Sequence, residues 1–150
     1  MECLLNAIII DIDGTLMDND KHIGHDEEIA NNDYEWFSPL IPTFIPSDWA
    51  ITLINSLAGT VKIIFITARI DTRRGDTRLW IDKWFKFNSE MPYKLLMRPF
   101  TSVAKDYKLK ETLYFRYVRD NYNVLCAFDD KKEILNMYRE YNIPTMNVKY

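Results

Sequence analysis

Acidic and hydroxyl side chains follow three apolar runs of the sequence, each at the point where the run ends. Asp11-Ile12-Asp13-Gly14-Thr15, Thr67-Ala68-Arg69 and Asp129-Asp130-Lys131 are these segments. Carboxylates that converge repel one another unless a cation neutralises them, and oxygen ligands favour a hard ion such as Mg²⁺. A single acidic residue at such a place is more often a turn former or a helix cap. Agreement at three run ends favours a magnesium site instead.

Spacing excludes two other ion-binding or phosphate-binding loops. A calcium EF-hand loop needs its glycine at the sixth position, whereas Gly14 is the fourth residue counted from Asp11. A P-loop needs the pattern G-x-x-x-x-G-K-[ST], and the four glycines of the chain do not form it. The sequence therefore predicts no nucleotide binding by a P-loop.

Apolar runs that alternate with helical patterns must position these side chains. Alternation of this kind predicts right-handed crossovers and a three-layer α/β sandwich around a mainly parallel five-stranded sheet. Ligands of such sheets lie outside the carboxyl ends of the strands, where the acidic residues fall. The expected strands are residues 4–10, 61–66, 93–97, 124–128 and 145–148, and the expected helices are 48–58, 76–87, 103–121 and 131–141.

Residues 16–46 form a long connection after the first expected strand. The segment is acidic at first and then rich in aromatic residues and in proline (Pro39, Pro42 and Pro46). It is too long for an ordinary turn, so we expect a small flap or lid beside the site. Trp36, Phe37, Phe44 and Trp49 are candidates to stack on a nucleobase, whereas Trp80, Trp84 and Phe87 are expected in the core.

Composition predicts one globular domain over residues 1–150, because 150 residues with 47% hydrophobic side chains are enough for one continuous core. No apolar stretch approaches the roughly 20 residues that cross a bilayer. Cys3 and Cys126 lie in apolar runs and are expected as buried thiols. We therefore expect a cytoplasmic protein without membrane attachment, and no feature indicates an obligate protein partner.

Charge is distributed unevenly along the chain. Residues 1–68 carry a formal charge of −9 and residues 69–119 carry +7, although the whole chain carries only −3. Arg69, Arg73 and Arg74 directly follow the second expected strand, so they can line the mouth of the site and bind a polynucleotide backbone. The alternative, equally compatible with the sequence, is that these arginines pair with the acidic segment of the folded chain.

The order of these motifs resembles the haloacid dehalogenase (HAD) superfamily of phosphohydrolases. Asp11 to Thr15, a strand that leads into Thr67, a lysine on a later helix and Asp129-Asp130 match its four motifs in order. Within the superfamily, the chain resembles the 3′-phosphatase domain of bacteriophage polynucleotide kinase/phosphatase. Thr67-Ala68-Arg69, Lys83-Trp84, Lys105-Asp106 with Lys110-Glu111, and Phe128 to Lys131 carry that likeness.

The resemblance implies a HAD-like Rossmannoid fold and roles for individual residues. Asp11 would be the nucleophile that forms an aspartyl-phosphate, and Asp13 the general acid and base. Thr67 and Lys110 would bind the phosphoryl group, although Lys110 considered alone is expected on a solvated helix face. Thr15 would orient the loop and contact the substrate, and Mg²⁺ would be held by Asp11, the backbone carbonyl of Asp13, and Asp129 or Asp130, with Asp129 preferred as the direct ligand.

Three functions are compatible with the sequence. The favoured one is a Mg²⁺-dependent polynucleotide 3′-phosphatase in nucleic-acid end repair, whose partner is a phosphorylated nucleic-acid end. A phosphatase of mononucleotides or other small esters is the alternative. A phosphoacceptor domain like a response-regulator receiver is disfavoured, because a receiver places its acid pair after the first strand and its lysine after the last.

Overall fold

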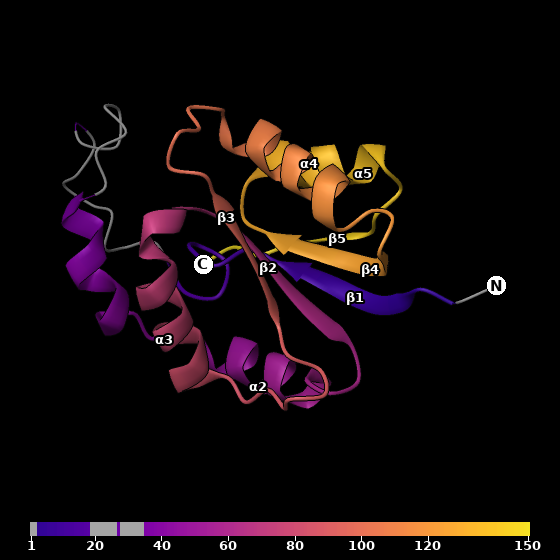
Figure 1. The fold of residues 1–150 in the computed structure, drawn as a ribbon, viewed down its shortest axis with the longest axis horizontal. Coiled ribbons are helices and arrows are strands. Elements are labelled where there is room, and N and C mark those ends of the chain that lie inside the picture. Colours follow the sequence, from indigo (N-terminus) through magenta and orange to yellow (C-terminus); the bar gives the residue numbers. More distant parts are fainter. Residues whose placement is uncertain (1–2, 19–26, 28–34) are drawn as a thin grey trace.

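Five strands form one sheet in which every neighbouring pair is parallel, as the computed structural model of the chain shows (Figure 1). The structure describes residues 3–18, 27 and 35–150. The strand order is β3-β2-β1-β4-β5, so β1 lies in the centre. The predicted α/β class is confirmed. The strands are β1 (Leu5–Ile10), β2 (Lys62–Ile70), β3 (Lys94–Arg98), β4 (Tyr122–Asp129) and β5 (Thr145–Asn147).

Helices cover both faces of the sheet, which gives the three layers that the sequence predicted (Figure 1). The helices α2 (Asp48–Leu57) and α3 (Arg74–Trp84) lie on one face, together with the 3₁₀ segments η2 (Glu35–Thr43) and η3 (Asp71–Arg73). The helices α4 (Asp106–Tyr117) and α5 (Lys132–Glu140) lie on the other face. Two apolar clusters result, one on each side, because the central strand is buried on both faces.

Element ends differ from the predicted ones where tertiary pairing overrides local pattern. β2 continues to Ile70, whose partner in β3 is Arg98, so Thr67 and Arg69 lie on the strand and not after it. α4 is shorter than the predicted helix at both ends. The prediction of two buried thiols is wrong for Cys3, which is exposed beside the start of β1, and Cys126 is half-buried.

Part of the expected flap is packed into the core. Within η2 and just after it, Phe37, Ile41 and Phe44 are buried in the same cluster as α3. Leu16 and Met17, at the start of the segment, are buried there as well. Residues 19–26 and 28–34 lie outside the described residues, so the flap itself stays a prediction.

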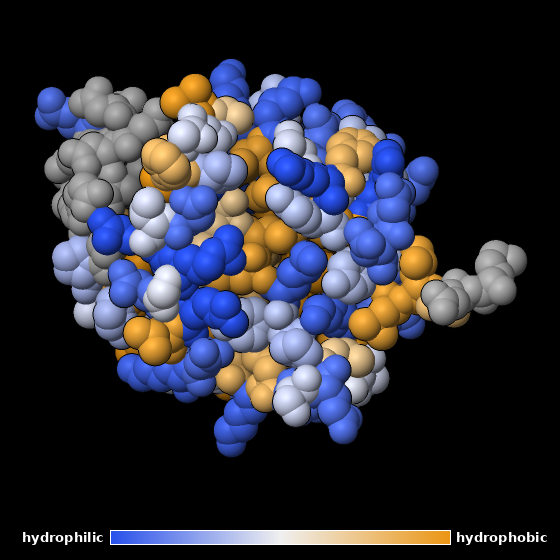
Figure 2. Space-filling view, viewed as in Figure 1, coloured by the Kyte–Doolittle hydropathy of each residue, from blue (hydrophilic) through white to orange (hydrophobic). Residues whose placement is uncertain are grey.

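The surface facing the viewer in Figure 2 is mostly polar, with hydrophobic side chains visible in the middle of the face and at the N-terminal end of β1. Leu4 and Leu5 are about 40% exposed there, at 44% and 43%. This end of β1 is opposite to the end where Asp11 follows the strand. Over the part of the chain that the structure describes, no helix has the length and apolar character needed to cross a membrane.

Candidate active site

The loop after β1 places Asp11 at the carboxyl edge of the sheet, beside the end of β4. The Asp11 amide donates to the carbonyl of Phe128 at 3.0 Å, which continues the pairing of the two strands by one residue. Gly14 adopts a φ of +80°, which a residue with a side chain rarely adopts, and so lets the chain turn back. The buried Thr15 hydroxyl then donates to Asp11 Oδ2 at 2.9 Å. This hydrogen bond restricts the orientation of the Asp11 carboxylate.

Lys110 reaches the same carboxylate from α4. Its Nζ donates to Asp11 Oδ1 at 2.7 Å and to Asp129 Oδ2 at 2.8 Å, and its side chain is only 2% exposed. The alternative of a solvated helix face is therefore wrong for Lys110, although it describes Lys108, whose side chain is 58% exposed. A buried ammonium between two buried carboxylates is a structural link between β1, β4 and α4.

Three aspartates cluster around the single ammonium group of Lys110. Carboxylate oxygens of Asp11, Asp129 and Asp130 lie within 4.8 Å of one another, whereas Asp13 does not belong to this cluster. Burial, with the charges of Asp129 and Asp130, raises the pKa of Asp11 to about 8 despite the opposing effect of Lys110. Burial and Asp129 also raise the pKa of Asp130. Although burial opposes it, Asp11 and Asp129 raise the pKa of Lys110.

This donor set fits a hard divalent cation. All three side chains offer oxygen, and when all three are ionised their charges exceed that of Lys110 by two. The two oxygens of Asp129 already accept hydrogen bonds, one from Lys110 Nζ and one from the Lys131 amide at 3.0 Å. Asp130 is half-buried, and one of its oxygens accepts a long hydrogen bond of 3.5 Å from the Thr15 hydroxyl. Of the pair, Asp130 is thus the more accessible to an ion.

Asp13 is held by an arginine and not by the acid cluster. Arg69 Nε and Nη2 donate to the two oxygens of Asp13, both at 2.8 Å, and Nη1 donates to Thr77 Oγ1 at 3.3 Å. The guanidinium also lies 5.2–5.8 Å from the ring centroids of Phe37, Phe44 and Trp80. The planar guanidinium group of Arg69, which lies among these aromatic rings, therefore fixes both the position and the rotation of the Asp13 carboxylate.

The other predicted site residues lie on or near β2. Thr67 is buried, and its hydroxyl oxygen accepts a hydrogen bond from the Arg69 amide at 3.1 Å. The Arg74 side chain donates to the carbonyl of Leu95 at 2.9 Å, and Arg73 lies in η3. Arg69 was expected to contact substrate, but the structure buries it against Asp13. Substrate binding by Arg73 and Arg74 stays a prediction.

We expect Arg69→Lys to lower kcat by about 100-fold and to destabilise the fold by about 2 kcal/mol, because lysine cannot make two parallel hydrogen bonds to Asp13. Urea unfolding and phosphate-release assays measure the two effects. Arg119→Lys is the matched control, since Arg119 also contacts both oxygens of an aspartate, Asp120, but at the exposed surface. Equal effects of the two substitutions would contradict a positioning role for Arg69.

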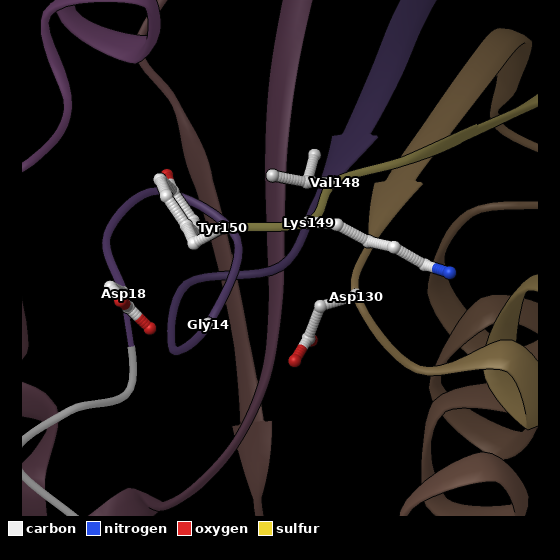
Figure 3. Close-up of a pocket in the computed structure, with 6 residues that line it drawn as sticks. All are labelled: Gly14, Asp18, Asp130, Val148, Lys149 and Tyr150. Atoms are coloured by element: carbon white, nitrogen blue, oxygen red, sulfur yellow. The ribbon is translucent and has the colours of Figure 1, made fainter.

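A hollow of about 250 Å³ opens beside the acid cluster (Figure 3). Gly14 and Asp18 of the loop after β1 line one side, and Asp130 lines another. Residues that follow β5 complete it: Val148, Lys149 and Tyr150. Figure 3 shows the carboxylates of Asp18 and Asp130 directed to the same side, while the Lys149 amine extends away from the other labelled residues. Sequence reasoning missed Tyr150, because a tyrosine after the last strand carries no motif.

The aromatic residues fall differently from their predicted roles. Phe37 and Phe44 are buried around Arg69, so they are core residues and do not offer a stacking surface. Trp49 is 38% exposed and packs against Phe128, at 6.4 Å between ring centroids. Trp80 lies in the core as predicted, and the partly buried Trp84 and Phe87 pack against this core cluster. The Trp36 side chain lies outside the described residues.

A parallel sheet with acids at the carboxyl ends of β1 and β4, joined by a helix lysine, defines a HAD-type phosphatase. The sequence model of the polynucleotide kinase PNKP phosphatase domain matches residues 5–150, and the chain belongs to this family. The resemblance noted from the motifs is thereby confirmed.

Relatives agree with this assignment. A putative bifunctional polynucleotide kinase/RNA ligase of Autographa californica nuclear polyhedrosis virus is 33% identical over 144 residues, which are 93% of this chain. The chain spans only 19% of that relative's length. Two solved structures of a Pnkp1/Rnl/Hen1 complex, one titled as an RNA repair complex, match 98% of the chain with TM-scores of 0.75 and 0.74. The chain covers 43% and 47% of the matched chains at 24% identity, so these structures support the fold alone.

Proposed function

We propose that this phosphatase removes 3′-terminal phosphates from polynucleotides in nucleic-acid end repair, through an aspartyl-phosphate on Asp11. The observation that carries the proposal is the Asp11 carboxylate at the end of β1, with Lys110 on one oxygen and Thr15 on the other. Both donors fix the carboxylate against rotation. A nucleophile held in one orientation loses little entropy when it attacks.

The reaction has two steps. An oxygen of Asp11 attacks phosphorus, the bond from phosphorus to the ester oxygen breaks, and Asp13 protonates the leaving alcohol. In the second step Asp13 takes a proton from a water molecule that attacks the same phosphorus, which frees inorganic phosphate and regenerates Asp11. Arg69 holds the Asp13 carboxylate in place for both transfers. Lys110 and the Thr67 hydroxyl are the fixed donors available to the phosphoryl oxygens.

The proposed cofactor is Mg²⁺, held by Asp11 and Asp130, with Asp129 orienting Lys110 and supporting the site. When bound, the ion supplies Lewis-acid stabilisation of phosphoryl charge. Asp130 is half-buried whereas Asp129 is only 1% exposed, which favours Asp130 as the direct ligand, the reverse of the preference drawn from the sequence. Chelation should abolish activity and added Mg²⁺ restore it. Asp130→Asn should raise the Mg²⁺ concentration for half-maximal activity at least about tenfold, and an unchanged requirement would contradict this assignment.

The family and the names of the relatives support a polynucleotide substrate. The matching family is the phosphatase domain of polynucleotide kinase, and the viral relative is described as a polynucleotide kinase/RNA ligase. The positive charge of residues 69–119 also favours a polyanion over a single nucleotide. Cytoplasmic location and the absence of an obligate protein partner remain expectations. A structural neighbour is part of an RNA repair complex, so a repair protein is a partner to test.

A substrate comparison tests the proposed function. Purified protein with Mg²⁺ is given a 3′-phosphorylated oligonucleotide, its 5′-phosphorylated counterpart and nucleoside 3′- and 5′-monophosphates. We expect the highest kcat/KM on the 3′-phosphorylated oligonucleotide. Preference for a mononucleotide would favour the small-molecule alternative, and stable phosphorylation without turnover would favour a phosphoacceptor.

A further inference from the structure

Tyr150 follows β5, and its phenol group contacts the loop after β1 and the residue before α2. Its phenol oxygen donates to the carbonyl of Thr15 at 2.9 Å and lies 2.7 Å from Ser47 Oγ. Ser47 is the residue before α2 and its side chain makes no helix cap. Both contacts involve the phenol oxygen of the tyrosine, and the residue as a whole is 56% exposed.

Tyr150 and Asp130 line the same hollow (Figure 3). The hollow is therefore lined by the aromatic side chain of Tyr150 and by the carboxylates of Asp18 and Asp130, and Asp130 belongs to the acid cluster. A nucleoside offers the complementary groups: a base with two flat faces to stack on an aromatic ring, and hydroxyl or amino donors for a carboxylate. Its phosphate would then lie toward Asp11 and Asp130.

We infer that this hollow binds the terminal nucleoside that carries the scissile phosphate, with its base stacked on Tyr150 and a donor group directed to Asp18. The inference rests on the proposed function and adds the recognition of a base to it. Stacking is tolerant of sequence because every base has a flat face, so the site accepts any terminal base. Tyr150 is a substrate-binding residue here and takes no part in the bond changes.

The test compares two 3′-phosphorylated oligonucleotides that differ only in their last nucleotide, which carries a base in one and is abasic in the other. The unmodified protein should show about tenfold higher kcat/KM on the base-bearing substrate. Tyr150→Leu should remove that ratio by lowering kcat/KM on the base-bearing substrate alone. Tyr150→Phe loses the hydrogen bonds to Thr15 and Ser47 but keeps the ring, so it should keep the ratio.

Tyr117→Leu is the matched control, because this partly exposed tyrosine ends α4, far along the helix from Lys110. It should leave both substrates unaffected. Equal rates of the unmodified protein on the two oligonucleotides, or equal losses on both in Tyr150→Leu, would overturn the inference and leave the proposed function intact. If neither oligonucleotide is hydrolysed, the proposed function fails. The same variants on a nucleoside monophosphate and ribose 5-phosphate then decide the role of the ring.

Discussion

Asp11→Asn should abolish phosphate release while the protein stays folded. The amide cannot attack phosphorus or carry a phosphoryl group, so we expect kcat to fall at least about 10⁴-fold, as for other enzymes that lose a nucleophile. The fold should survive because asparagine keeps the shape of the side chain and an oxygen that can accept from Lys110. The substitution also removes a charge that burial and two neighbouring carboxylates disfavour. Phosphate release and thermal unfolding are the measurements.

Asp120→Asn is the control for this substitution. It makes the same chemical change in an exposed aspartate that pairs with Arg119, so activity and unfolding temperature should stay as in the unmodified protein. Near-normal turnover by the Asp11→Asn protein would remove Asp11 from its proposed role. A loss of activity that accompanies unfolding would show only that Asp11 is structural.

The sequence predicted the layers of the fold because continuous apolar runs mark strands buried on both faces. Ile8, Ile9 and Ile10 of β1 are all buried, as a central parallel strand requires. Convergence of Asp11 with Asp129 and Asp130 followed from the same argument, since the carboxyl ends of β1 and β4 must meet at one edge.

The environment of the arginines could not be predicted in the same way. Arg69 was expected directly after the second strand because the apolar run ends at Ile66, but pairing with β3 extends β2 to Ile70. On an extended strand Thr67 and Arg69 point to the same side, which buries both at the site edge. Whether a charged residue continues a strand depends on its tertiary partners, here Asp13 and three aromatic rings, and not on local pattern.

Helix geometry explains why Lys110 and Lys108 have different environments. Two residues along an α-helix correspond to a rotation of about 200°, so side chains at these spacings point in nearly opposite directions. Because α4 begins at Asp106, at the carboxyl edge of the sheet, its first turns bring one face to the acids. Lys110 occupies that face and Lys108 the solvent face, where it pairs with Glu111. That Lys108 and Lys110 point in nearly opposite directions follows from their spacing in the sequence. Which of the two faces the acids depends on how the helix is rotated about its axis, and packing decides that rotation.

Lys110→Met should destabilise the metal-free protein by about 3–5 kcal/mol, the usual cost of removing one partner of a buried ion pair. Asp11, Asp129 and Asp130 would then share a buried site with no compensating ammonium. Added Mg²⁺ should recover much of this loss, because an ion that binds only the folded state stabilises it by mass action. We expect kcat to stay reduced by about 10³-fold even at saturating Mg²⁺, since a fixed donor to the phosphoryl group is missing.

Urea unfolding with and without Mg²⁺ separates the two roles of this lysine. The difference in unfolding free energy made by Mg²⁺ should be larger in Lys110→Met than in the unmodified protein, in which the ammonium already neutralises part of the charge. Lys108→Met makes the same change two residues away, at an exposed side chain, and should alter neither stability nor its dependence on Mg²⁺. If Mg²⁺ stabilised all three proteins equally, the ion and Lys110 would not act on the same carboxylates, and the metal site would have to lie elsewhere.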